Sequence, residues 1–310
     1  MELQMQLEDV SIVIPSLGRP EVVSRLVEQV CRLPVRPNET IVVFQDRHEL
    51  EMFTELVSGG SIRPVFCEIR SAAYARNAGA GIARGRILVF LDDDCIPSGE
   101  WLAKLTDPVR RGEACCSTGP VSNWNSVRRL RWWPDGRRAS IVLWGALHPV
   151  QISATSRANT AGTVLGGNFA VTREAFWKVG GFDRRFRGAS MYEETALSLL
   201  IRRSTMRRIV FVPDAAVIHR QAAVGGMRTV EVDAGWLGGQ RAKLIAAVRK
   251  DQYGVWFSAG MAIAIYTILH GVRRDGRKAC RQFARGLVSE LRRGASEMDG
   301  EALRSQGGVH

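Results

Sequence analysis

The chain has 310 residues, 45% of them hydrophobic, which is enough for a sizeable folded core and argues against a disordered protein. Its 43 lysines and arginines exceed its 31 aspartates and glutamates, giving a formal net charge of +12. This charge favours anionic partners, such as nucleotide phosphates, polyanions or an anionic membrane surface, without choosing among them.

The cysteines and the N-terminus both indicate a cytoplasmic protein. The six cysteines form no C-x-x-C pair and show no zinc-site spacing, so we expect reduced and mostly buried thiols. The first nine residues are acidic and lack the basic and apolar regions of a signal peptide. We therefore expect the catalytic part in the cytoplasm, with the inner face of the cell membrane as a place of attachment.

Strands and helices alternate over the first 91 residues. We expect strands at 10–14, 40–44, 65–69 and 86–91, and a turn at 15–20. Helices are expected at 21–31 and 72–83, and a further helical stretch follows the second strand and runs through residue 57. This alternation predicts a parallel α/β sheet whose ligands bind beyond the carboxyl ends of the strands.

The pattern becomes looser after a predicted helix at 101–111. Strands are expected at 167–171 and 208–212, and helices at 174–179 and 192–203. Between them, residues 124–138 combine tryptophans with arginines. This segment is either an acceptor-side loop that stacks sugars and binds phosphates, or an insertion whose tryptophans cover the sheet.

The C-terminal part has a different composition, so we predict a catalytic domain at 1–225 and a basic helical region at 226–310. Residues from Arg241 onward include 13 basic and six acidic side chains. Within this region, residues 252–272 carry no formal charge and reach the length of about 20 residues that a membrane span needs. A core helix, an interfacial helix at the membrane surface and a span remain three readings of this stretch.

Three adjacent acids, Asp92, Asp93 and Asp94, directly follow the apolar strand at 86–91. Neighbouring carboxylates repel one another, and their burial is costly unless a cation or strong donors compensate. Mg²⁺ and Mn²⁺ prefer such oxygen ligands and keep positions for substrate phosphates. The triplet is therefore a candidate metal site, with a solvated acidic turn as the alternative.

One βα unit upstream, Arg76 and Asn77 lie early in the predicted helix at 72–83. Arginine offers planar donors for phosphate or ribose oxygens, while Gly79 and Gly81 allow a close backbone approach. We expect this helix to contribute to ligand binding at the same edge of the sheet as the triplet.

Together these residues resemble family 2 of the inverting, nucleotide-sugar-dependent glycosyltransferases, which have the GT-A fold. The matching segments are 10–15 with Arg19 and Pro20, 75–79, 85–94, 166–169, 180–183, and Glu193-Glu194. They cover roughly residues 10–219 in order. The fold implied by the resemblance is α/β, with a GT-A-type, Rossmann-like, mostly parallel central sheet, flanking helices and a helical C-terminal extension.

The resemblance also implies roles for individual residues. Asp92 is expected to face the nucleotide ribose, and Asp94 to bind Mn²⁺ or Mg²⁺ that bridges the donor diphosphate, with Asp92 and His219 as further candidate ligands. Glu193 and Glu194 stand at the catalytic position, the second as the general base. The residues expected around the donor are Pro15, Ser16, Arg19, Gln45, Asp46, Arg76, Asn77, Asp92, Asp93, Gly166, Gly167 and Asn168.

Two positions depart from the family pattern. Where the family often has Asp-Asp after the second strand, this chain has Gln45-Asp46, so either side chain is a candidate for contacting the nucleobase. Glu194 replaces the usual aspartate at the base position. A base on the first helical turn would be held rigidly, although acids also occur there simply as helix caps.

The expected function is metal-dependent, inverting transfer of a sugar from a nucleotide-diphosphate donor to a hydroxyl acceptor. The acceptor is a lipid-linked glycan, a cell-wall glycan or a small natural product. The alternatives are a nucleotidyltransferase and a non-enzymatic basic protein that binds membranes or nucleic acid. No RNA- or DNA-reading motif is recognisable, so no specific nucleic-acid partner is expected, whereas peripheral membrane contact through the C-terminal region is.

Overall fold

A computed structural model describes residues 5–56, 62–123, 160–187, 191–220, 233–249, 252–270 and 276–306. The chain divides into two compact units, one formed by Met1–Ile141 with Pro149–Thr229 and the other by Val142–His148 with Val230–His310. We call them the sheet unit and the helical unit. The segment 124–138 and the predicted domain boundary at 225/226 lie outside the described residues.

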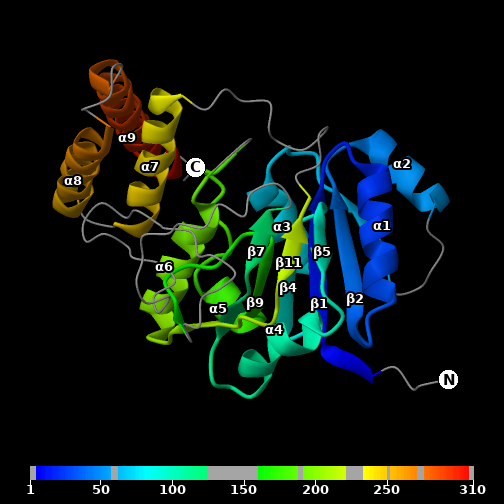
Figure 1. Cartoon of the computed structure of the whole chain (residues 1–310). Coiled ribbons are helices and arrows are strands. Elements are labelled where there is room, and N and C mark those ends of the chain that lie inside the picture. Colours follow the sequence, from blue (N-terminus) through cyan, green and yellow to red (C-terminus); the bar gives the residue numbers. More distant parts are fainter. Residues whose placement is uncertain are drawn as a thin grey trace. The chain divides into compact units, whose positions relative to one another are not determined.

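The sheet unit is built on a mixed sheet of eight described strands, ordered β3-β2-β1-β4-β9-β6-β10-β8. Figure 1 shows β1 between β4 and β2. The strands are β1 (Met5–Ser16), β2 (Val35–Phe44), β3 (Ile62–Phe66), β4 (Ile87–Leu91), β6 (Cys116–Thr118), β8 (Thr160–Ala161), β9 (Asn168–Thr172) and β10 (Ile209–Phe211). The first four pair in parallel, as the alternation predicts, but β9 runs antiparallel to both β4 and β6.

A second, three-stranded sheet lies beside the carboxyl end of β4. It consists of β5 (Cys95–Pro97), β11 (Val217–His219) and β7 (Val121–Asn123), with β11 in the middle. β11 pairs antiparallel with β5 and parallel with β7. This small sheet brings His219 to the end of the Asp triplet, although the two are distant in the sequence.

Successive side chains of a strand point to opposite faces of the sheet, so the central strands contribute residues to a core on each face. On one face, Ile12, Val42 and Val89 belong to a core with the buried sides of α1 (Pro20–Cys31) and α4 (Trp101–Arg110). On the other face, α3 (Ala72–Ile82) approaches so closely that a Cβ on Gly79 would come within 2.5 Å of Val13 Cγ1. Gly79 thereby lets α3 lie directly on the sheet.

Most predicted elements are confirmed within a few residues. The predicted helices correspond to α1, α2 (Arg47–Leu56), α3, α4, α5 (Arg173–Lys178) and α6 (Glu193–Thr205). The predicted strand at 65–69 is wrong in position, because pairing with β2 places β3 at Ile62–Phe66 and Cys67 follows it. The short strands β5, β6, β7, β8 and β11 were not predicted.

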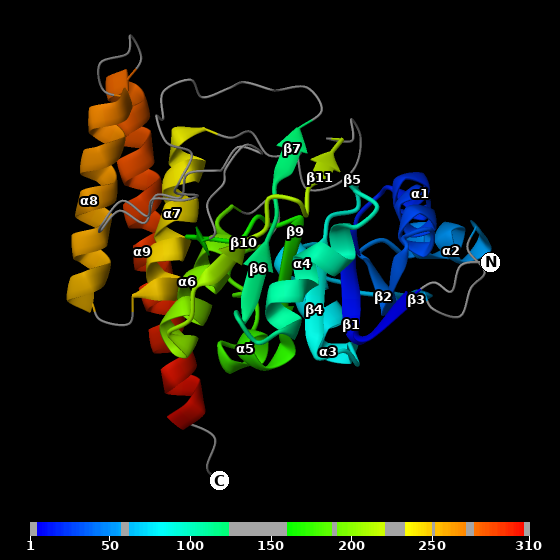
Figure 2. The same ribbon diagram turned by 60° about the horizontal axis from the view of Figure 1, so that its bottom comes forward.

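The helical unit contains α7 (Ala234–Val248), α8 (Gln252–His270) and α9 (Gly276–Gln306), which lie side by side in Figures 1 and 2. Helices α7 and α9 pack backbone to backbone, since a Cβ on Gly238 or Gly286 would overlap a carbonyl of the other helix. The Tyr266 ring of α8 stacks on the Phe283 ring of α9, with centroids 4.1 Å apart. Of the helices described, none is both long and apolar enough to cross a membrane.

Candidate functional site

The Asp triplet occupies the sharp connection between β4 and β5, and its members point in different directions. The side chain of Asp92 is 31% exposed, whereas those of Asp93 and Asp94 are 7% and 2% exposed. A backbone hydrogen bond from Cys95 N to Asp92 O closes the turn. The two buried carboxylates therefore depend on partners from other elements, so Asp93 and Asp94 are not part of a solvated turn.

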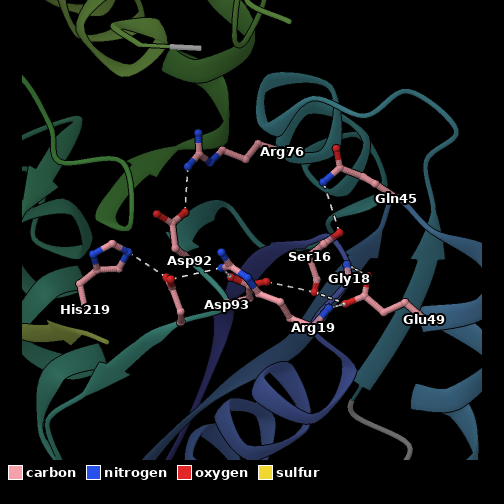
Figure 3. Close-up of polar contacts among 10 residues, drawn as sticks. Ser16, Gly18, Arg19, Gln45, Glu49, Arg76, Asp92, Asp93 and His219 are labelled. Atoms are coloured by element: carbon pink, nitrogen blue, oxygen red, sulfur yellow. Dashed lines mark hydrogen bonds and ion pairs between the residues drawn. The ribbon is translucent and has the colours of Figure 1, made fainter. Parts of the chain in front are cut away.

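Arg19, which follows the carboxyl end of β1, supplies the first of these partners. Its Nη1 atom lies 2.8 Å from Asp93 Oδ1 and 3.2 Å from Asp94 Oδ2, as Figure 3 shows for Asp93. The guanidinium itself is 6% exposed, so these are buried ion pairs. Arg19 is thus placed to neutralise the two inner carboxylates of the triplet.

Asp93 also contacts Ser16 at the end of β1. Ser16 Oγ lies 3.1 Å from Asp93 Oδ2 and 2.5 Å from Glu49 Oε1. Ser16 Oγ is the donor in both contacts and shares its one hydrogen between the two carboxyl groups. Burial raises the pKa of Asp93 to about 7, against the opposing effect of Arg19.

Glu49, in the first turn of α2, fixes the chain that carries Arg19. Its carboxylate accepts hydrogen bonds from the backbone N–H groups of Gly18, at 2.7 Å, and Arg19, at 2.9 Å. Gly18 has φ +69°, a left-handed conformation that glycine adopts without strain. The carboxylate thereby holds the turn that positions the Arg19 guanidinium.

Asp94 divides its two carboxylate oxygens between two partners. Oδ2 faces Arg19, while Oδ1 lies 2.9 Å from His219 Nε2. The backbone supports this arrangement, because Arg220 N donates to Asp94 O at 2.9 Å. The predicted neighbours Asp94 and His219 are therefore brought together.

A metal ion would suit the pair formed by Asp94 and His219. Together with Cys95 they form a group whose potential ligand atoms all lie within 4.8 Å of one another. A carboxylate oxygen and an imidazole nitrogen are accepted ligands of Mn²⁺. These metal-ligating atoms thus fit a divalent cation. Asp92 lies beside this group of ligands, with its carboxylate directed to Arg76.

Arg76 joins the triplet to the acids at the start of α6. Its Nη2 atom lies 2.8 Å from Asp92 Oδ1, and its Nη1 atom lies 3.3 Å from Glu194 Oε1 and 3.5 Å from Glu193 Oε1. Burial disfavours the charged guanidinium, but these three carboxylates outweigh that effect and raise the pKa of Arg76. Arg76 thus stays cationic and links the predicted ribose-facing acid to the predicted base.

Glu193 and Glu194 occupy the first turn of α6, after Tyr192, whose φ of +76° is left-handed. Burial and the neighbouring Glu193 raise the pKa of Glu194 to about 8, although Arg76 opposes this. Among the described residues, Arg76 Nε and Glu193 Oε2 are buried polar atoms without a hydrogen-bond partner. Such orphaned atoms beside a candidate base indicate a place for a ligand or ordered water.

The Gly166-Gly167 turn lies against both groups of acids. A Cβ on Gly166 would overlap the Glu194 carboxylate, and a Cβ on Gly167 would come within 2.8 Å of Asp92 Oδ2. A larger residue at either position would therefore displace these carboxylates. The turn thus lies between the acid that follows β4 and the acid at the start of α6.

The Asn168 side chain was predicted to lie by the sugar, but it forms hydrogen bonds within the protein instead. Its side chain accepts from Trp101 Nε1 at 2.7 Å and donates to the carbonyls of Ala215, at 2.7 Å, and Pro120, at 3.0 Å. The residue is fully buried. Asn168 therefore holds the glycine turn against α4 and the segment that leads to β11.

Of the other residues predicted around the donor, Asn77 and Gln45 form side-chain hydrogen bonds to neighbouring backbone segments. Asn77 exchanges hydrogen bonds with the backbone of Phe182, while Gln45 bonds Ser16 O and Ser71 N. Asp46 accepts from His48 N and pairs with Arg70 on the exposed side. Pro15 is buried within β1. Of the two candidates for contacting the nucleobase, only Asp46 is partly exposed.

Sequence reasoning missed two residues of this site, Glu49 and Cys95. Glu49 looks like an ordinary acid in the first turn of a helix, where such residues are common. Cys95 looks like a small core residue after an acidic cluster. Both become informative only through partners that are distant in the sequence, so neither carries a local signal.

Comparison with known proteins gives a family and a fold. A family model described as "Glycosyl transferase family 2" matches residues 11–180. The glucosyl-dolichyl phosphate glucuronosyltransferase of Haloferax volcanii is 24% identical over 215 residues, 66% of this chain and 66% of that protein. The chain thus spans about two thirds of the length of this relative.

Two solved structures show the same fold at low identity. One is GalNAc-T7 with UDP, GalNAc and Mn²⁺, which has 19% identity and a TM-score of 0.62, covering 89% of this chain and 55% of that chain. The other is a mannosyltransferase from Pyrobaculum calidifontis with GDP-Man and Mn²⁺, with 13% identity, a TM-score of 0.53, and coverage of 91% and 87%. These likenesses confirm the predicted GT-A-type fold class with its C-terminal helices.

Proposed function

The chain belongs to glycosyl transferase family 2, and on this premise we propose that it transfers a sugar, with inversion, from a nucleotide-diphosphate donor to a hydroxyl acceptor. One observation carries the proposal. The single guanidinium of Arg76 binds Asp92, at the end of β4, and Glu194, at the start of α6. The Gly166-Gly167 turn packs against both carboxylates.

In this proposal the donor diphosphate lies near Asp92 and Asp94. Asp94 Oδ1 and His219 Nε2 would hold a Mn²⁺ or Mg²⁺ ion, which would supply positive charge to stabilise the departing diphosphate. Arg19 balances the charge of the remaining carboxylate oxygens. UDP in one structure of the same fold and GDP-Man in another, each with Mn²⁺, support a nucleotide donor and a divalent cation here.

Glu194 is the proposed general base. In this role its carboxylate accepts the proton of the acceptor hydroxyl as the oxygen attacks the anomeric carbon. A pKa of about 8 makes the carboxylate a stronger base than an exposed glutamate, while Arg76 fixes its direction. Attack by the acceptor itself, assisted by one base, leads to inversion at the anomeric carbon.

We further propose a lipid-linked acceptor at an anionic membrane surface. The relative from Haloferax volcanii is named for a dolichyl phosphate substrate, which supports an acceptor of this class. In the helical unit, Trp256 and Phe257 of α8 are 48% and 50% exposed. The exposed residues of α9 include Arg277, Lys278, Arg281 and Arg285. Exposed aromatic and basic side chains on neighbouring helices suit the headgroup region of an anionic bilayer.

The test is a screen of nucleotide sugars with Mn²⁺ that follows nucleoside diphosphate release. Glu194→Gln should lower kcat by about 10²- to 10⁴-fold while nucleotide protection against thermal unfolding persists. Glu174→Gln is the matched control, since Glu174 is an exposed acid in the first turn of α5. Full turnover in Glu194→Gln would overturn the role of the base, and pyrophosphate release from a nucleoside triphosphate would indicate a nucleotidyltransferase.

A further inference from the structure

Cys95 stands beside the two proposed cation ligands and has no part in the proposed function. Its Sγ atom, a carboxylate oxygen of Asp94 and a ring nitrogen of His219 all lie within 4.8 Å of one another. Cys95 is 2% exposed, and a Cβ on Gly167 would come within 3.1 Å of its Sγ. The sulfur therefore lies at the glycine turn of the site.

The backbone fixes this proximity. β5 and β11 are antiparallel, and their register pairs Cys95 directly with His219. Directly opposed residues of an antiparallel pair project to the same face, with Cβ atoms about 4.5–5.5 Å apart. Thiol and imidazole are thus neighbours because of strand pairing, and Arg220 N anchors Asp94 at the same point.

The chemistry of the three side chains differs from that of an all-oxygen site. Mg²⁺ prefers oxygen ligands, whereas thiolate sulfur selects softer cations of the zinc class. Catalytic zinc sites commonly have three protein ligands and one open position. Asp94 can contribute Oδ1 to such a set, because Arg19 lies against Oδ2.

We propose that Asp94, Cys95 and His219 form a thiophilic cation site that binds Zn²⁺ or Co²⁺ through the Cys95 sulfur more tightly than it binds Mn²⁺ or Mg²⁺. Bond formation between the cation and sulfur releases the thiol proton to solvent. Zn²⁺ then competes with Mn²⁺ for Asp94 and His219. The inference rests on the proposed function only for the location of the catalytic cation.

The alternative is a cysteine that only fills space, since Cys95 also belongs to the apolar core that includes Trp101. The two roles differ in what they predict for a bound cation. A packing cysteine leaves no sulfur signature on the metal. A ligand cysteine gives a sulfur-to-cobalt charge-transfer band in the near ultraviolet.

The experiment is a titration of the full chain with CoCl₂ under a phosphine reductant. The wild type should develop the charge-transfer band, and Cys95→Ser and Cys95→Ala should lose it while retaining the wild-type far-ultraviolet circular dichroism. Cys67→Ser, which changes a partly exposed cysteine just after β3, should retain the band. Zn²⁺ should displace Co²⁺, and Cys95→Ser should weaken Zn²⁺ binding by at least about tenfold relative to Mn²⁺ binding.

A wild-type cobalt complex without the sulfur band, or a band that persists in Cys95→Ala, would overturn the proposal. If that protein still turns over a donor with Mn²⁺, glycosyl transfer stands and only the cysteine ligand fails. Conversely, a sulfur band in a protein that releases no nucleoside diphosphate from any donor would support the cation site and count against the proposed function.

Discussion

Arg76 Nη2 donates to Asp92 Oδ1 at 2.8 Å, although Arg76 lies within α3 and Asp92 follows β4. The other terminal nitrogen of the same guanidinium reaches Glu194 on α6. One buried cation therefore sets the separation between the acid proposed to face the donor and the acid proposed to take the proton. This geometry depends on α3 packing directly on the sheet at Gly79.

We predict that Arg76→Lys lowers kcat strongly but lowers the thermal unfolding temperature only slightly. Lysine keeps the positive charge but lacks the planar fork that contacts both acids at once. The misplaced Glu194 carboxylate should reduce kcat by about 10²-fold. Steady-state kinetics combined with thermal unfolding checks this, and an unchanged kcat would show that Arg76 has no positioning role.

The pH profile of kcat should report Glu194. Because burial and Glu193 raise its pKa to about 8, the carboxylate is largely protonated below that pH and ionised above it. With donor and acceptor saturating, kcat should rise about tenfold per pH unit below the midpoint and level off above it.

Glu193→Gln should move that midpoint to lower pH, because it removes a like charge that favours the protonated form of Glu194. Mn²⁺ binding is measured at each pH, so that cation loss is not mistaken for base protonation. A kcat that does not change between about pH 6 and 9 would rule out Glu194 as the titrating base.

Glu49→Gln should weaken the binding of Mn²⁺ and nucleotide. The substitution removes the negative charge that accepts hydrogen bonds from the backbone N–H groups of Gly18 and Arg19. The Arg19 guanidinium is then held less firmly against Asp93 and Asp94. We expect a loss of about 1–3 kcal/mol in the free energy of unfolding and a smaller thermal shift with Mn²⁺ and nucleotide.

Glu39→Gln is the matched control for Glu49. Glu39 is also buried and accepts from Ser11 Oγ, Arg63 Nη1 and Arg84 N, but it lies before the carboxyl half of β2. Its loss should lower stability to a similar degree without changing the ligand-induced shift. Equal losses of that shift in both variants would show that Glu49 acts only on stability.

Vesicle binding should depend on the helical unit. Trp256→Ala should weaken binding to anionic vesicles, and Arg281→Gln should weaken it about fivefold, since a basic residue near the surface contributes about 1 kcal/mol. Trp177→Ala, which removes a tryptophan of α5 that is 40% exposed, should have no effect. Vesicle co-sedimentation measures the binding. Equal binding by all three variants would contradict the proposed membrane contact of the helical unit.

The sequence predicts the parts of the fold that depend on local pattern. The apolar runs of β1, β2 and β4, and the small-residue pattern of α3, are visible without knowledge of their partners. The strands β5 and β11 have three residues each, and only their pairing with one another defines them. The antiparallel direction of β9 likewise shows only in its pairing with β4 and β6.

The same distinction applies to the site. Asp94 follows an apolar strand, Arg76 lies early in a predicted helix and Glu194 begins another, so their closeness could be expected, whereas their roles rest on the family resemblance. Asn168 and Gln45 were expected to touch the donor, but whether an amide faces a ligand or a neighbouring carbonyl is decided by packing. Glu49 was missed because its partners are the backbone N–H groups of a turn on β1.

The pairing of β5 with β11 has a consequence for the order of folding. Contacts between residues far apart in sequence form late, because a long stretch of chain must be ordered first. During synthesis, Asp94 and Cys95 emerge well before the strand that carries His219. A nascent chain therefore displays the acids before the proposed cation site is complete, so tight cation binding at that site would be a late event that reports a finished sheet unit.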